Sequence, residues 1–164
     1  MAGHPLAEEF FKEVVQPTVN EYLGQPQDIR RGRLAAIVLE HMVDYWHVDT
    51  GESKSAIRAA LRTDTPILNH PNYWSADLIR DVADASKHAR LNRALRMLTC
   101  AEQINSRHVG AWNTTTYNLV PYGGQRGADA EIKLDNGKIY ILKNAVYQVS
   151  EAWRKKLGLP QARP

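Results

Sequence analysis

Three side chains between residues 75 and 92 have types and spacing suited to proton transfer at a phosphate. Arg80, Asp84 and His88 recur every four residues, so on a helix they form a line at the polar flank of its apolar stripe. A histidine exchanges protons near neutral pH, and a guanidinium stabilises charge on a phosphate. RNA supplies its own nucleophile, the 2′-hydroxyl, so cleavage would need no metal or other cofactor. In that chemistry His88 is the acid/base, Arg80 the phosphate stabiliser, and Asp84 the residue that orients them.

The same three residues also have a purely structural interpretation. Arg80 and Asp84 are spaced to form an ion pair, and Asp84 is spaced to accept a hydrogen bond from the ring of His88. Such a ladder is common on the exposed side of an amphipathic helix. A non-enzymatic helical module that binds a protein or a nucleic acid therefore stays open as the alternative function.

The basic residues are concentrated in two places that favour a polyanionic partner. The chain carries a formal net charge of +3 and has a pI of about 9.0, which permits such a partner without requiring it. We expect nucleic-acid contacts from the clusters Arg30, Arg31 and Arg33 and Lys87, Arg90 and Arg93. They would form one phosphate-binding surface only if the fold brings them together; otherwise each is a solvated helix face.

Positioning these residues requires a mainly helical fold. Apolar periodicity predicts helices over 6–23 (interrupted at Pro17), 28–48, 54–62 and 75–92. The helix over 28–48 is apolar around most of its circumference, which predicts a central place in a bundle. Leu34, Val38, His41 and Tyr45 share one side of it, and Ala35, Leu39, Met42 and Trp46 lie beside them.

The end of the chain predicts a hairpin and a last helix. Alternating apolar residues at about 129–142 flank the turn signal Asn136–Gly137, and Asn144 is a candidate N-cap for the helix that follows. The segment 95–120 is ambiguous, and a strand from it would extend the hairpin to a small sheet. The predicted fold is mainly α: a four- to five-helix bundle, an antiparallel hairpin and a final helix, forming one domain over 1–158 with a tail at 159–164.

The segment Asp81-Val-Ala-Asp-Ala-Ser-Lys-His88 resembles the HEPN superfamily. Those domains are helical bundles, often dimeric, with an arginine and a histidine on one helix and a supporting acid on another. The resemblance matches Arg80 and His88 to that pair, Asp84 to the polar residue between them, and Asp44 or Glu40 to the supporting acid. Seven residues separate Arg80 from His88, one more than the family pattern has.

The resemblance implies an RNA-acting protein, in particular a metal-independent endoribonuclease of a bacterial defence or toxin–antitoxin type. It also implies a homodimer that pairs the helices over 75–92, since one Arg/His pair supplies half of a two-proton mechanism. Other HEPN proteins are non-catalytic binding modules. The overall layout is also similar to a group of short bacterial hypothetical proteins, and that similarity implies no activity.

Composition bounds the remaining possibilities. His41, Asp44 and His47 offer a weaker alternative, a divalent-metal site, but they spread widely around their helix. The single cysteine, Cys100, excludes an internal disulfide. No apolar run approaches the roughly 20 residues that cross a bilayer, and the N-terminal segment does not resemble a secretory signal. We therefore expect a cytoplasmic protein without a membrane partner.

Overall fold

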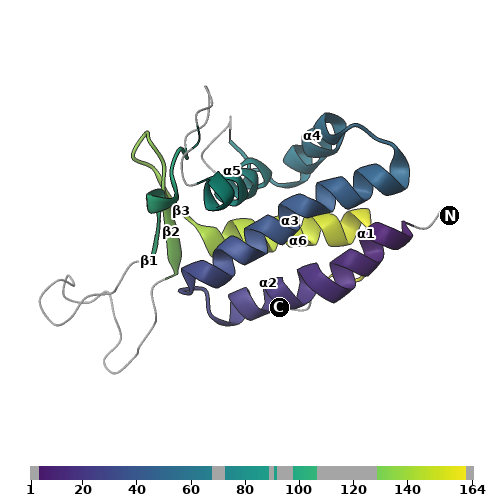
Figure 1. The fold of residues 1–164 in the computed structure, drawn as a ribbon, viewed down its shortest axis with the longest axis horizontal. Coiled ribbons are helices and arrows are strands. Elements are labelled where there is room, and N and C mark those ends of the chain that lie inside the picture. Colours follow the sequence, from purple (N-terminus) through teal and green to yellow (C-terminus); the bar gives the residue numbers. More distant parts are fainter. Residues whose placement is uncertain (1–3, 68–72, 89–90, 92–97, 107–128, 162–164) are drawn as a thin grey trace, which may run out of the picture.

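The computed structural model describes residues 4–67, 73–88, 91, 98–106 and 129–161. They form a mainly helical structure with a small antiparallel sheet and a final helix, which confirms the predicted fold class (Figure 1). The elements in chain order are α1 (Pro5–Phe10), the π-helical η1 (Phe11–Val15), α2 (Gln16–Gly24), α3 (Ile29–Thr50), α4 (Lys54–Asp64), α5 (Ser75–His88), the 3-10 turn η2 (Ala101–Gln103), β1 (Ile104–Ser106), β2 (Ala130–Lys133), β3 (Ile139–Ile141) and α6 (Leu142–Lys156).

The N-terminal helices α1, η1 and α2 follow one another as a single rod that packs along α3 (Figure 1). Pro17 does not break this rod, although its ring removes one N–H donor and crowds the carbonyl four residues earlier. That carbonyl belongs to Glu13, within the π-helical turn. The wider turn accommodates the proline where a regular α-helix would bend sharply.

Helix α3 occupies the centre of the structure, as predicted, and contacts α1, α2, α4, α5 and α6. It begins at an N-cap, where the Asp28 side chain accepts a hydrogen bond from the Arg31 backbone N–H at 3.1 Å. It ends at Gly51, whose φ of 71° is the left-handed conformation that glycine adopts most readily. Its buried side carries Ala35, Ala36, Leu39, Met42, Val43 and Trp46. The neighbouring apolar side, which includes Leu34 and Tyr45, is exposed.

Helices α4 and α5 complete the helical layers on another side of α3. Ser53 caps α4 by accepting a hydrogen bond from the Ala56 N–H, and α4 packs on α3 and α5. Helix α5 buries the predicted stripe of Leu78, Ile79, Val82 and Ala85 against α3 and α6. The described part of this helix ends at His88; most of the predicted continuation to 92 lies outside the described residues.

The three strands form an antiparallel sheet in the order β1-β2-β3. Ile104 pairs with Ile132, and Ile132 pairs with Tyr140 on the other side. The hairpin turns at Asn136–Gly137, where Gly137 has a φ of 81°. The ambiguous segment 95–120 therefore supplies a third strand at 104–106, while its predicted extended stretch at 114–120 lies outside the described residues.

The final helix α6 starts two residues earlier than predicted. Strand β3 leads directly into it, Ile141 is the N-cap residue, and Asn144 lies inside the helix instead of capping it. Leu142 and Val146 are buried among the other helices, so tertiary packing sets this start. No helix in the described part of the chain combines the length and apolar character needed to cross a membrane.

Candidate functional site

Arg80, Asp84 and His88 lie on α5 in the order that the sequence predicts, but their surroundings differ. Arg80 is about one-quarter exposed, Asp84 is half-buried, and His88 is exposed at the last residue of the helix. Eight helical residues span about 12 Å along the axis, so Arg80 and His88 lie more than two turns apart. No hydrogen bond or ion pair joins His88 to another residue of the described part of the chain.

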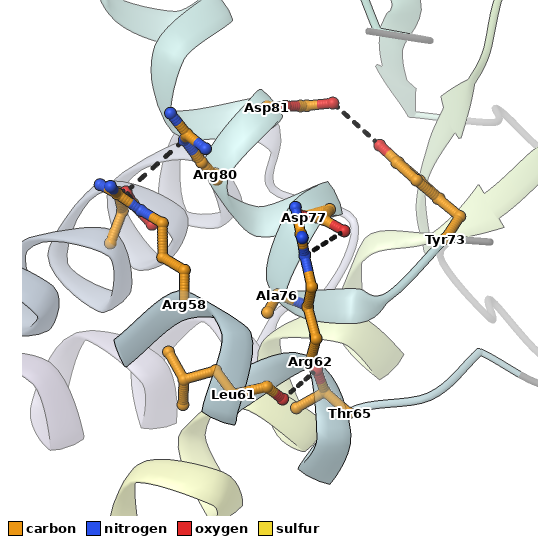
Figure 2. A network of polar contacts seen from close by, with 10 residues as sticks. Arg58, Leu61, Arg62, Thr65, Tyr73, Ala76, Asp77, Arg80 and Asp81 are labelled. Carbon is orange, nitrogen blue, oxygen red and sulfur yellow. Dashed lines mark hydrogen bonds and ion pairs between the residues drawn. The ribbon is translucent and has the colours of Figure 1, made fainter. Parts of the chain in front are cut away.

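Arg80 forms an ion pair with Glu40 of α3, with 4.0 Å between Nε and Oε1. The same Glu40 oxygen accepts hydrogen bonds from Arg58 of α4, at 3.0 Å from Nε and 2.5 Å from Nη2. Figure 2 shows Arg58 and Arg80 approaching this carboxylate from two helices. Burial raises the pKa of Glu40, the two arginines lower it, and the nearby charge of Asp84 raises it again.

Glu40 is thus the acid of α3 that lies beside Arg80. Asp44, the other acid that the resemblance offered, is half exposed and forms an ion pair with Lys54 at 2.6 Å. The two carboxylates occupy successive turns of one helix, but Asp44 points to the first turn of α4. A supporting role beside Arg80 therefore falls to Glu40.

The surroundings of Arg80 are a structural network rather than an open site. Arg62 of α4 binds Asp77 of α5 through Nε, 3.0 Å from both oxygens, and Tyr73 donates a hydrogen bond to the buried Asp81 at 3.1 Å (Figure 2). The pocket beside Glu40 and Arg80 has room for about one water molecule. A nucleotide does not fit there.

A larger groove lies between the start of α3 and the end of α5. Its volume is about 350 Å³, and the residues that line it are Ile29, Arg30, Arg33, Leu34, Ile37 and Ser86. We call these six residues the basic groove. Two of the six are arginines and none is a carboxylate, so this part of the described surface presents positive charge above apolar side chains.

The two arginines of the basic groove differ in their partners. Arg33 donates a hydrogen bond from Nη2 to the Ala101 carbonyl at 2.8 Å, a neutral acceptor that leaves the guanidinium charge uncompensated. Arg30 is exposed. Arg31, the third member of the predicted cluster, is paired with Asp28 at 3.4 Å and does not line the groove.

Lys87 and His41 extend the positive region from the basic groove. Lys87 Nζ lies 3.1 Å from His41 Nε2, and His41 is one helical turn beyond Ile37. Burial and the charge of Lys87 lower the pKa of His41, and Asp44 opposes them. The fold therefore brings Lys87 next to the α3 arginines, as a shared phosphate-binding surface requires. Arg90 and Arg93, also predicted to bind nucleic acid, lie outside the described residues.

The weaker metal alternative finds no convergent ligands. His41 contacts Lys87, whereas His47 Nδ1 lies 2.6 Å from the Glu52 carbonyl oxygen in the loop after α3. Within the described ranges, no group of three or more histidine, cysteine or acidic side chains is arranged to hold a metal ion.

Sequence reasoning missed two contacts of this region. One is the contact between His41 and Lys87, which joins residues 46 positions apart and has no local signal. The other is the bridge that Glu40 makes between Arg58 and Arg80. A hint of the second was available: Glu40 is a lone acid near the apolar side of a central helix, where a carboxylate needs a cationic partner.

Comparisons with known proteins add no relative to this geometry. No family model, curated protein or solved structure matches the chain. The resemblance of residues 81–88 to the HEPN superfamily therefore stays a prediction from the motif. The candidate function must be argued from the side chains themselves.

Proposed function

We propose that this protein acts on RNA and holds the phosphate backbone at the basic groove. The observation that carries the proposal is the convergence of Arg30 and Arg33 with the end of α5, without a carboxylate among the six lining residues. Guanidinium groups bind phosphate in a planar, bidentate manner. The apolar floor of Ile29, Leu34 and Ile37 suits an unpaired base, and unpaired bases are what proteins usually recognise in RNA.

His88 is the residue that would turn RNA binding into cleavage. It is exposed at the end of α5, where the helix dipole favours its protonated form, and it directly follows Lys87. A proton exchanged by His88 would serve the 2′-hydroxyl or the leaving oxygen, while Arg33 and Lys87 would stabilise the phosphate. Arg80 is less suited to that last role than the motif suggests, because it shares its charge with Glu40.

Binding is tested by fluorescence anisotropy with labelled single-stranded RNA and with DNA of the same sequence. The variants are Arg33→Ala and Lys87→Ala, with Lys12→Ala as the matched control, since Lys12 is an exposed lysine of η1. Together, the two substitutions at the proposed site should weaken RNA binding about tenfold or more. Each lost phosphate contact should also reduce the salt dependence of log K by roughly 0.7. Equal affinities for all variants would contradict the proposal.

Cleavage is tested by incubating the protein with labelled tRNA and mixed RNA in EDTA, beside His88→Ala. Because His88 makes no polar contact in the described structure, this variant should retain its circular dichroism spectrum. Cleavage by the unmodified protein alone would identify a metal-independent ribonuclease. RNA binding without cleavage would favour the non-enzymatic module, an outcome that the Glu40–Arg80 ion pair supports.

A further inference from the structure

The exposed apolar side chains of this protein are gathered on one side. Five of the seven large apolar residues that are exposed in the described part of the chain lie on α1, η1 and α3: Leu6, Val14, Leu34, Tyr45 and Val48. These helices pack together, and the ring of Phe10 stacks on Tyr45 with 3.9 Å between centroids. We call these six residues, with Val38 and His41 between them on α3, the outer face. Concentrations of exposed apolar residues of this kind mark sites of protein association.

On α3 the outer face has the spacing of a helix-pairing surface. Leu34, Val38, His41, Tyr45 and Val48 are separated alternately by four and three residues. This is the heptad spacing with which one helix packs against another. The intramolecular core uses the neighbouring row of Ala35, Leu39, Met42 and Trp46. Helix α3 thus carries two apolar rows, of which the second has no partner helix in the described structure, and Val48 in it is 67% exposed.

The charges flanking the outer face identify the occupant. The start of α3 is basic, with Arg30, Arg31 and Arg33, and its end is acidic, with Asp44, Asp49 and Glu52 just beyond the helix. The arrangement is symmetric about His41, because Arg30 lies eleven residues before it and Glu52 eleven residues after it. A second α3 in the opposite direction would therefore place Glu52 against Arg30 at both ends. A parallel arrangement would put like charges together.

We propose that the outer face binds a second copy of this chain, with the two α3 helices antiparallel and His41 beside the two-fold axis. Leu34 would then face Val48 of the second copy. Val38 would face Tyr45, and the symmetry repeats each contact. This interface differs from the one that the motif resemblance implies, which pairs α5 with α5. The proposal does not rest on RNA binding, and its tests are made without RNA.

The association is tested by sedimentation velocity over a concentration series. We expect a dimer, and we expect Val48→Lys to weaken it at least about tenfold by burying two lysines. Ile139→Lys is the matched control, since Ile139 is 56% exposed but lies on β3, and it should leave the dimer intact. A chain that stays monomeric up to about 100 μM, where a dimer with a Kd of roughly 1 μM is mostly associated, overturns the proposal. A dimer that Val48→Lys does not weaken overturns this choice of face.

The antiparallel register is tested by exchanging charges. Arg30→Glu and Glu52→Arg should each weaken the dimer by creating like-charge pairs, and the double variant should restore it. Circular dichroism must show that each variant is folded, because Glu52 also accepts a hydrogen bond from the Trp46 indole at 3.4 Å. A double variant no tighter than either single variant contradicts this register.

A disulfide test gives an independent reading of the same register. In a Cys100→Ser background, His41→Cys should form a disulfide-linked dimer under oxidation, because the two cysteines would lie beside the axis. Leu34→Cys should not, because the two copies of residue 34 would be about 21 Å apart along the helices. Efficient linkage through residue 34, without linkage through residue 41, overturns the antiparallel arrangement.

Discussion

Arg80 of α5 and Glu40 of α3 form an ion pair between the two helices that share the most extensive contact in the structure. The Glu40 oxygen that faces Arg80 also accepts both hydrogen bonds from Arg58 of α4. One carboxylate thereby joins three helices. Arg80, the residue that the motif assigned to phosphate stabilisation, contributes to this joint, and the free arginines of the basic groove are better placed to bind phosphate.

The first prediction concerns the stability of this joint. Glu40→Ala should lower the free energy of unfolding by about 1–3 kcal/mol, because Arg58 and Arg80 lose their acceptor in a largely buried position. Glu40→Gln should cost less, since its amide oxygen still accepts from Arg58 and no buried charge remains. Urea unfolding measures both variants. Glu8→Ala is the control; it removes an exposed ion pair with Lys12 and should change the stability by less than about 1 kcal/mol. Equal losses for Glu40→Ala and Glu8→Ala would contradict the role of the joint.

The second prediction concerns pH. The pKa of His41 in the folded protein is lowered from its ordinary value of 6.5 by burial and by Lys87. Between that lowered value and 6.5 the unfolded chain binds more protons, so stability falls as the pH drops through this window and is fully present above it. His41→Gln should remove this part of the pH dependence, and Lys87→Met should reduce it.

Urea unfolding at matched protein concentrations, above pH 7 and below pH 6, measures the effect of His41. Glu40 acts in the opposite sense: its pKa is raised, so its contribution to stability falls as the pH rises above 4.5. This opposite trend is common to the unmodified protein and to His41→Gln, and the difference between the two isolates His41. An identical pH dependence for both proteins would show that His41 does not contribute.

The third prediction concerns Gly32, which lies inside α3 against Tyr22 and Leu142. A Cβ at this position would lie 2.7 Å from Leu142 Cδ2 and 3.0 Å from Tyr22 Cε2. Gly32→Ala gains roughly 1 kcal/mol of helix propensity but forces overpacking that costs about 1–3 kcal/mol. We expect a net loss of stability in thermal or urea unfolding. Gly24→Ala is the control, because a Cβ there meets no atom within 4 Å. A more stable Gly32→Ala variant would show that the Tyr22 ring moves aside without cost.

Local interactions determined much of this structure from the sequence alone. The helical periods of α3 and α5, the Ser53 cap of α4 and the Asn136–Gly137 turn depend on residues close together in the chain, and each appears where the pattern predicts. The start of α6 depends on packing instead, so the local signal of Asn144 was wrong. The third strand at 104–106 likewise depends on β2, more than 20 residues away.

Only the tertiary structure decided which apolar side of α3 is buried and which partner each charge has. Leu34, Val38 and Tyr45 are as apolar as Ala35, Leu39 and Trp46, so periodicity cannot distinguish the core row from the exposed one. Arg80 had an acid one turn away on its own helix, yet its ion pair is with Glu40, 40 residues distant. Helical spacing sets which side chains share a face, but burial and partner choice follow from the helices that pack there, and a single helix carries no record of them.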